Sequence, residues 1–177
     1  RTMFLGWPDV SVEFYVQSNG AIGVSARSVK GTRHPLPEYF LVRFGVGETP
    51  EFREHGDPAA VQSLEDGFHT ICHTQWPSAA GPCTATAFAY PLAGEAVQTG
   101  YEPLGAFVRI RGNRAPVWLE VTPWSYNNMK DAEFENPLSG LSSARIENGV
   151  LVTGSRNTMA VTGNASLMQA TDERALV

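Results

Sequence analysis

The segment Thr122–Asn128 concentrates side chains that are typical of a ligand-binding loop. It combines two aromatic rings, Trp124 and Tyr126, with the amide of Asn127. Sugars are bound by such groups, because apolar C–H faces stack on rings while amides hydrogen-bond hydroxyls, and loops on a rigid scaffold often carry binding residues. A Trp beside a Pro also commonly closes the open end of a β-sandwich core. The segment therefore predicts a carbohydrate-binding or interface loop, with core packing as the alternative.

Carboxylates are the other groups that could do chemistry on a sugar, since glycosidases place two of them across the scissile bond. The candidates are Glu95, Glu102, Glu120, Asp131, Glu133 and Glu135. Many pairs can be drawn among them, so solvated loop charges are the favoured interpretation. A calcium site would use Asp131, Glu133, Glu135 and Asn136. These residues lack the glycine-containing spacing of a known calcium loop, and no calcium site is predicted.

The two histidines His69 and His73 invite a metal interpretation. On a strand they share a face but lie ~13 Å apart, which is too far for one ion with ligand bonds near 2 Å. Two ordinary sheet histidines are therefore expected. The chain also has no Gly-x-Ser-x-Gly elbow for a nucleophilic serine. We predict no catalytic residue, no metal and no cofactor.

Composition indicates one globular domain spanning residues 1–177, with 42% apolar and 18% charged residues. The formal charge of −5 and the presence of only two lysines, Lys30 and Lys130, argue against nucleic acid, whose affinity comes from Lys and Arg. No apolar stretch approaches the ~20 residues that span a bilayer. The chain begins at Arg1, and we expect a processed product or a fragment of a longer protein.

Two cysteines, Cys72 and Cys83, flank a Pro- and Gly-containing segment. If Trp76–Pro82 joins adjacent strands, the pair could form a disulfide, which would indicate an oxidising compartment. Two buried free thiols explain the same pair. A secreted or periplasmic location is slightly favoured over a cytoplasmic one.

The elements that must position these groups are predicted to be strands. Three segments read as alternating runs around a tight turn: Asp9–Gln17 and Ile22–Ser28 around Asn19-Gly20, Phe107–Arg111 and Pro116–Val121 around Gly112–Ala115, and Ala144–Glu147 and Val150–Thr153 around Asn148-Gly149. Asn-Gly favours the two-residue hairpin turn. Further turn signals recur along the chain, and only Asp172–Val177 suggests helix. The sequence predicts an all-β, antiparallel β-sandwich built from hairpins and meanders.

The second of these hairpins allows a predicted register. A loop centred on Asn113-Arg114 places Ile110 opposite Val117 on one face and Arg109 opposite Trp118 on the other. An Arg over an indole would be a cation–π pair worth ~0.5–1 kcal/mol.

The run from Gly105 to Pro123, Gly-Ala-Phe-Val-Arg-Ile-Arg-Gly-Asn-Arg-Ala-Pro-Val-Trp-Leu-Glu-Val-Thr-Pro, resembles a familiar pattern. It is similar to the N-terminal β-sandwich domains that precede (α/α)6-barrel catalytic domains in certain glycoside hydrolases and phosphorylases. The opening Trp7–Val24 and the hairpin Ala144–Val152 fit the same architecture more loosely. The resemblance implies a non-catalytic role, because in that family the acid and base usually lie on the helical barrel while the sandwich packs against it.

Three functional hypotheses follow. The first is a non-catalytic sandwich that packs against a helical catalytic domain or contacts a glycan, and it predicts an exposed apolar patch and no hydrolysis by this chain alone. Its expected contact residues are Trp118, Trp124, Tyr126, Asn127 and Arg109. The second is a small glycoside hydrolase or lyase that uses carboxylates around Glu120 and Asp131–Glu135. The third is a structural assembly module.

Overall fold

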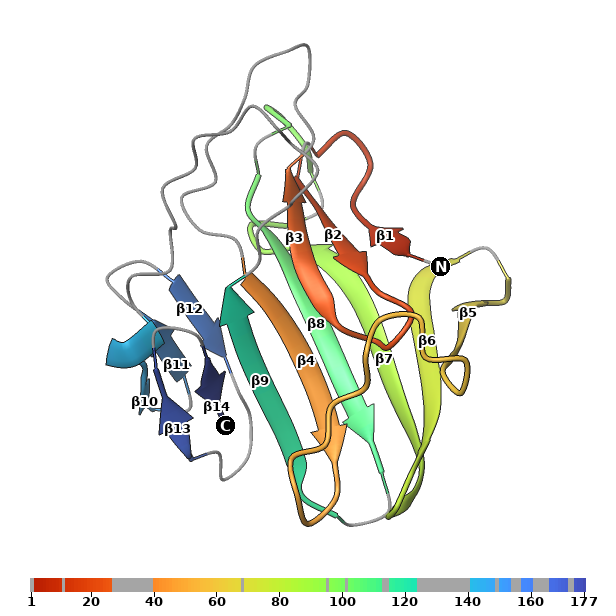
Figure 1. Cartoon of the computed structure of the whole chain (residues 1–177). Helices are drawn as coiled ribbons and strands as arrows, with labels where there is room; N and C mark the ends of the chain where they lie inside the picture. Colours follow the sequence, from red (N-terminus) through yellow and green to blue (C-terminus); the bar gives the residue numbers. More distant parts are fainter. Residues whose placement is uncertain are drawn as a thin grey trace, which may run out of the picture. The chain divides into compact units, whose positions relative to one another are not determined.

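The computed structural model describes residues 2–10, 12–26, 40–67, 69–94, 96–100, 102–112, 115–123, 141–148, 150–153, 157–160, 166–171 and 174–177. Within these residues the chain forms β-strands, one short 3-10 helix and connecting turns (Figure 1). Every strand pairing with a defined register is antiparallel. The predicted all-β class is confirmed. No helix among the described residues has the length and apolar character needed to cross a membrane.

The chain divides into two compact units. Unit 1 contains Arg1–Pro35 and Arg43–Val117, and unit 2 contains Leu36–Val42 and Trp118–Val177. The strands of unit 1 are β1 (Met3–Leu5), β2 (Val12–Val16), β3 (Ile22–Ala26), β5 (Val61–Glu65), β6 (His69–Ser78), β7 (Gly81–Pro91) and β8 (Leu104–Arg111). Unit 2 contains η2 (Leu141–Ser143), β10 (Arg145–Glu147), β11 (Val150–Thr153), β12 (Asn157–Ala160), β13 (Gln169–Ala170) and β14 (Ala175–Leu176). Two strands, β4 (Phe40–Val46) and β9 (Val117–Pro123), hold residues of both units. The expectation of one domain stays a prediction.

Unit 1 is an antiparallel sandwich in which the hairpins β1-β2-β3 pack on the sheet β5-β6-β7-β8. The β2–β3 turn meets the inner face of the second layer at Gly20, where an added Cβ would lie 3.4 Å from Thr74. Gln62 of β5 donates from Nε2 to the carbonyl oxygen of Gln17 at 2.7 Å. These contacts join the two layers, and the sandwich architecture predicted from the hairpins is confirmed for this unit.

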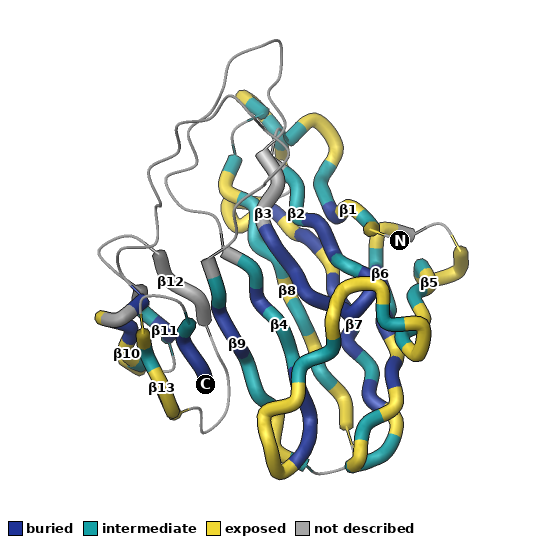
Figure 2. The backbone as a smooth tube through the Cα atoms, viewed as in Figure 1, coloured by how far each residue is buried: buried dark blue, intermediate teal, exposed yellow. Residues whose placement is uncertain are grey.

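The core of unit 1 depends on a strand of small residues. Every second position of β7 from Cys83 to Pro91 is buried (Figure 2). Four of these positions hold the small residues Cys83, Ala85, Ala87 and Ala89. The small side chains leave room for Trp76, which is only 5% exposed and clusters with Val46, Cys83 and Ala85. Burying so large an aromatic side chain supplies a large share of the unit's apolar stabilisation.

The β2–β3 hairpin is confirmed, but its turn is longer than the predicted two residues. The amide of Gln17 donates to the Ala21 carbonyl at 2.8 Å, and Gly20 donates to the Gln17 carbonyl at 2.9 Å. Only Gly20, with φ of 83°, takes up the left-handed conformation here, so three residues form the loop, as in a type I turn with a glycine bulge. Asn19 instead uses its side chain, accepting from Ala21 N and donating to Arg53 O.

The hairpin around Asn148 has the predicted short turn. Glu147 lies opposite Val150, so two residues connect β10 to β11. Asn148 has φ of 51°, the left-handed conformation that this turn type requires. A third strand, β12, pairs with β11 and completes a meander. The helix suggested for Asp172–Val177 is wrong, because Ala175–Leu176 forms β14, which pairs with β9 and with β13.

The predicted hairpin over Phe107–Val121 is wrong. Strand β8 pairs with β7, so that Phe107 lies opposite Phe88, whereas β9 belongs to another sheet and pairs with β14. Alternating apolar and polar residues indicate strands, but they do not identify the partner strand. The local turn signal between β8 and β9 did not reveal that β8 pairs along its length with β7 instead.

Both cysteines, Cys72 and Cys83, are buried and have free thiols. In the β6–β7 ladder Cys72 lies opposite Ala87, and Cys83 lies opposite Trp76. The offset of four residues separates the two thiols by ~13 Å along the strands, well beyond the reach of a disulfide. The disulfide alternative is therefore excluded, and it gives no support to an oxidising compartment.

Candidate functional site

The outer face of the sheet β5-β6-β7-β8 exposes a stacked pair of phenylalanines. Phe88 of β7 and Phe107 of β8 lie directly opposite each other in the ladder. Their ring centroids are 5.2 Å apart and the ring planes differ by 13°. The two side chains are 36% and 43% exposed, respectively. Alanines fill the inward positions around Phe88 in β7, so the aromatic side chain of Phe88 faces outward. The two rings therefore form a flat aromatic surface in contact with solvent.

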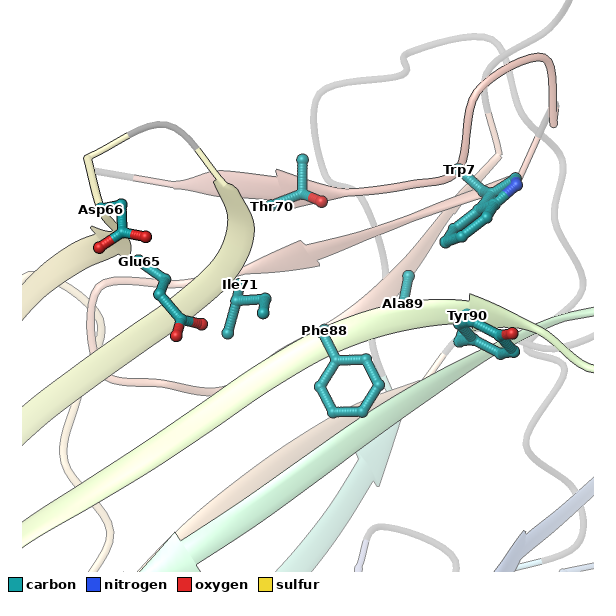
Figure 3. Close-up of a pocket in the computed structure, with 8 residues that line it drawn as sticks. All are labelled: Trp7, Glu65, Asp66, Thr70, Ile71, Phe88, Ala89 and Tyr90. Carbon is teal, nitrogen blue, oxygen red and sulfur yellow. The ribbon is translucent and has the colours of Figure 1, made fainter. Parts of the chain in front are cut away.

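An open pocket of about 450 Å³ adjoins this pair (Figure 3). Its lining residues are Trp7, Glu65, Asp66, Thr70, Ile71, Phe88, Ala89 and Tyr90. The ring centroids of Trp7 and Tyr90 are 5.3 Å apart in an edge-to-face arrangement. Figure 3 shows these two rings at one end of the pocket and the carboxylates at the other, with Phe88 between them. The pocket therefore combines apolar surface with hydrogen-bond acceptors.

Two tight turns place the groups at the ends of the pocket. The turn from β5 to β6 has Asp66 and Gly67 in left-handed conformations, with φ of 51° and 81°, and the Gly67 amide donates to the Leu64 carbonyl at 3.0 Å. This turn presents Glu65 and Asp66 side by side. At the other end, Val10 N donates to Trp7 O at 3.1 Å, which closes the turn that follows Trp7.

A polar row crosses the same outer face below the aromatic pair. Ser63, His73, Thr86 and Arg109 lie opposite one another on the four successive strands. His73 Nδ1 is 3.1 Å from Thr86 Oγ1, and its Nε2 is 4.0 Å from a Glu65 carboxylate oxygen. Hydroxyl, imidazole and guanidinium groups of this kind can hydrogen-bond a polyhydroxylated ligand.

The connection between β7 and β8 borders the aromatic end of this face. Leu92 N donates to Pro103 O at 2.8 Å and closes the base of the connection. Glu102 accepts hydrogen bonds at 2.7 Å from the amides of Gln98 and Thr99. The hydrogen bond from the Thr99 amide has the largest effect, followed by the one from the Gln98 amide, and they lower the pKa of the Glu102 carboxyl to about 2.

The conformation of this connection is expected to depend on pH through Glu102. Because its pKa is lowered on folding, the ionised carboxylate stabilises the connection above pH 4.5, and this contribution is lost as the pH falls through about 2. An NMR titration of the Glu102 side chain should therefore have its midpoint near 2. In Glu102→Gln the Gln98 and Thr99 amides should lose the shift change that is centred near pH 2 in the unmodified chain. A Glu102 midpoint near 4.5 would contradict the assigned hydrogen bonds.

Of the five contact residues expected from the sequence, the structure places one on the outer face. Arg109 is an exposed residue of β8 within the polar row. Trp118 is half-buried in β9, which belongs to another sheet than β8, so the Arg109–Trp118 pair expected from the hairpin loses its basis. The residues Trp124, Tyr126 and Asn127 lie outside the described part of the chain.

The sequence did contain a signal for the missed aromatic residues. From Thr84 to Tyr90, alanine alternates with threonine and then with Phe88 and Tyr90. When alanines occupy every second position of a strand and fill the core side, the larger residues must face outward. Several large aromatic residues together on a solvent-facing surface indicate a binding surface, whereas a single exposed apolar residue does not.

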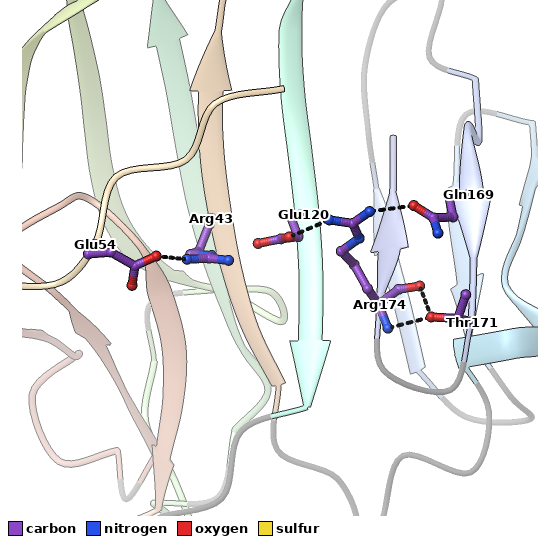
Figure 4. Close-up of polar contacts among 6 residues, drawn as sticks. All are labelled: Arg43, Glu54, Glu120, Gln169, Thr171 and Arg174. Atoms are coloured by element: carbon purple, nitrogen blue, oxygen red, sulfur yellow. Dashed lines mark hydrogen bonds and ion pairs between the residues drawn. The ribbon is translucent and has the colours of Figure 1, made fainter. Parts of the chain in front are cut away.

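The candidate carboxylates described by the structure have structural partners. Glu120 is buried at 2% exposure and accepts from Arg174 Nη1 at 3.4 Å, while Arg174 also contacts Gln169 and Thr171 (Figure 4). The expectation of a solvated charge is therefore wrong for Glu120, because burial of a carboxylate requires a cation or donors beside it. Glu95, Asp131, Glu133, Glu135 and Asn136 lie outside the described residues.

Among the residues that the structure describes, no three His, Cys, Asp or Glu side chains come close enough together to hold a metal ion. His73 Nδ1 contacts Thr86 Oγ1, and the side chain of His69 lies outside the described part of the structure. No family model, curated protein or solved structure matches this chain.

Proposed function

We propose that this chain is a non-catalytic β-sandwich of a carbohydrate-active enzyme and that it binds a glycan on the outer face of the sheet β5-β6-β7-β8. The observation that carries the proposal is the stacked Phe88–Phe107 pair, whose two aromatic rings are exposed to solvent. Such rings lose apolar contact with water when the C–H face of a sugar covers them. An exposed aromatic cluster of this kind on a rigid strand is typical of a recognition surface.

The polar row beside the aromatic pair supports the choice of a sugar over a purely apolar ligand. Thr86 and Arg109 lie one outward position away from Phe88 and Phe107 on the same two strands. Outward neighbours on a strand are about 6.8 Å apart, a distance that one ligand covering the face can bridge. The rings can take its apolar faces while the hydroxyl and guanidinium groups bind its hydroxyls.

The described candidate carboxylates Glu102 and Glu120 support a binding role over the hydrolase alternative. Glu120 is buried with Arg174, and Glu102 accepts amides of its own connection. A glycosidase instead needs two carboxyl groups on opposite sides of the scissile bond. The resemblance of Gly105–Pro123 to sandwich domains that accompany helical catalytic domains supports an accessory role as well.

The proposal is tested by measuring glycan affinity in variants of the aromatic pair. A glycan array should first identify an oligosaccharide bound by the chain. Phe88→Ala and Phe107→Ala are each expected to weaken its binding about tenfold, because truncating an aromatic contact costs on the order of 1–2 kcal/mol. Isothermal titration calorimetry measures the change.

The matched control is Phe4→Ala, since Phe4 is 48% exposed but belongs to β1, in the other layer of unit 1. This variant should bind the oligosaccharide as the unmodified chain does. An array on which no glycan binds, or an equal loss of affinity in all three variants, would contradict the proposal.

A further inference from the structure

Arginines in the described part of the chain fall into two groups. One group consists of arginines with a carboxylate partner, in the pairs Arg43–Glu54, Arg53–Asp57, Arg145–Glu147 and Arg174–Glu120. The other group consists of Arg109 and Arg111, for which no carboxylate of the described residues lies within ion-pair distance. Among the described arginines, pairing with a carboxylate is thus the more common state. Arg109 and Arg111, which lie two residues apart on β8, differ from the other described arginines in this respect.

Both arginines project from the outer face that carries the aromatic pair. Phe107, Arg109 and Arg111 occupy alternate, exposed positions of β8, and successive members of such a series are about 6.8 Å apart. Across the ladder, Arg109 faces Thr86 and Arg111 faces Thr84. The neighbouring strand therefore offers hydroxyl groups rather than acids to the two guanidinium groups.

Two like charges held this close on one face repel each other, and an anion placed between or over them removes the repulsion. Guanidinium groups bind carboxylate and sulfate through paired, charge-assisted hydrogen bonds, which are about twice as strong as neutral ones. The neighbouring threonine hydroxyls can add donors to the same anion.

The acidic groups of the face lie elsewhere. Glu65 and Asp66 are at the β5–β6 turn, at the edge of the sheet opposite β8. They disfavour an anionic ligand group at that edge, whereas the arginines favour one over β8. The charge distribution therefore gives a bound acidic ligand one preferred placement, with a ring on Phe107 and its anionic groups toward Arg109 and Arg111.

We propose that the glycan bound by this face is acidic and that Arg109 and Arg111 bind its carboxylate or sulfate groups. This inference rests on the proposed function and specifies its ligand class. Phe107 supplies the stacking surface, and the two arginines distinguish a charged oligosaccharide from a neutral one of the same length and linkage.

The test compares an oligogalacturonide with its fully methyl-esterified form, because the two share a backbone and differ in charge. A sulfated oligosaccharide and its desulfated form make the second pair of probes. Titration calorimetry on the full chain should give at least tenfold tighter binding of the charged member of one pair. Raising the salt concentration from 0.05 to 0.5 M should weaken that binding and leave the neutral member unchanged.

Arg109→Gln and Arg111→Gln are each expected to reduce the affinity for the charged member about tenfold and to leave the neutral member unaffected. Arg109→Lys should retain part of the affinity, because it keeps the charge and loses the paired donors. Arg145→Gln serves as the matched control, since Arg145 is an exposed arginine of unit 2 that pairs with Glu147. Thermal unfolding of each variant confirms that it is folded.

The possible failures are distinguishable. If charged and neutral members bind equally and Phe107→Ala weakens both, the inference is overturned while the proposed function stands. If no oligosaccharide binds to the chain at all, both are overturned. An equal effect of Arg145→Gln and Arg109→Gln would show a nonspecific charge effect and would also overturn the inference.

Discussion

Replacing Trp76 by alanine is expected to destabilise unit 1 by about 3–5 kcal/mol. Trp76 is 5% exposed and packs with Val46, Cys83 and Ala85, and those small neighbours cannot expand to fill the space that the indole leaves. The cost therefore includes both the lost burial of the ring and the cavity that remains. A loss of this size is a large part of the free energy of unfolding of an ordinary domain.

Chemical denaturation followed by circular dichroism measures this loss as a lower midpoint. Val61→Ala is the control, since Val61 lies in β5 of the same unit and is 62% exposed. It should change the unfolding free energy by less than about 0.5 kcal/mol. Equal effects of the two substitutions would contradict the placement of Trp76 in the core.

In unit 2, Leu151→Ala is expected to cost about 2–5 kcal/mol. Leu151 is 1% exposed and sits in β11, the central strand of the meander β10-β11-β12. Truncation at this position removes buried side-chain volume from the strand that both neighbours pair with. The amides of β10 and β12 should therefore exchange with solvent faster.

Hydrogen exchange followed by NMR measures that change, because exchange protection reports the local free energy of opening. Met168→Ala is the control in the same unit, since Met168 is 62% exposed. Protection of the meander that is equal in both variants would contradict a buried role for Leu151.

The sequence predicted those parts of the fold that depend on local chemistry. Asn148 and Gly20 mark real turns, because few residues tolerate the left-handed conformation that a hairpin turn needs. Strand class and the positions of these two hairpins could thus be derived from neighbouring residues alone.

The choice of partner for β8 could not be derived in this way. The sequences of β7 and β9 both alternate between two kinds of residue, and a different partner strand leaves each strand's own pattern unchanged. The pairing of Phe107 with Phe88 depends on residues nineteen positions apart in the sequence. The error had a functional consequence, because it directed attention to an Arg109–Trp118 pair and away from the aromatic surface.

Burial of Glu120 was missed for a related reason. A carboxylate in a strand resembles any solvent-facing charge until its partner is known, and Arg174 lies 54 residues further along the chain. Long-range ion pairs of this kind have no signature in local sequence.

The most direct test of the glycan-binding surface is NMR chemical-shift mapping of an oligosaccharide selected on the array. The proposal predicts that the largest shifts on titration occur at the amides of Phe88, Phe107 and Arg109, on the outer face of β7 and β8. Shifts confined to the β1-β2-β3 layer or to unit 2, with β7 and β8 unperturbed, would contradict it.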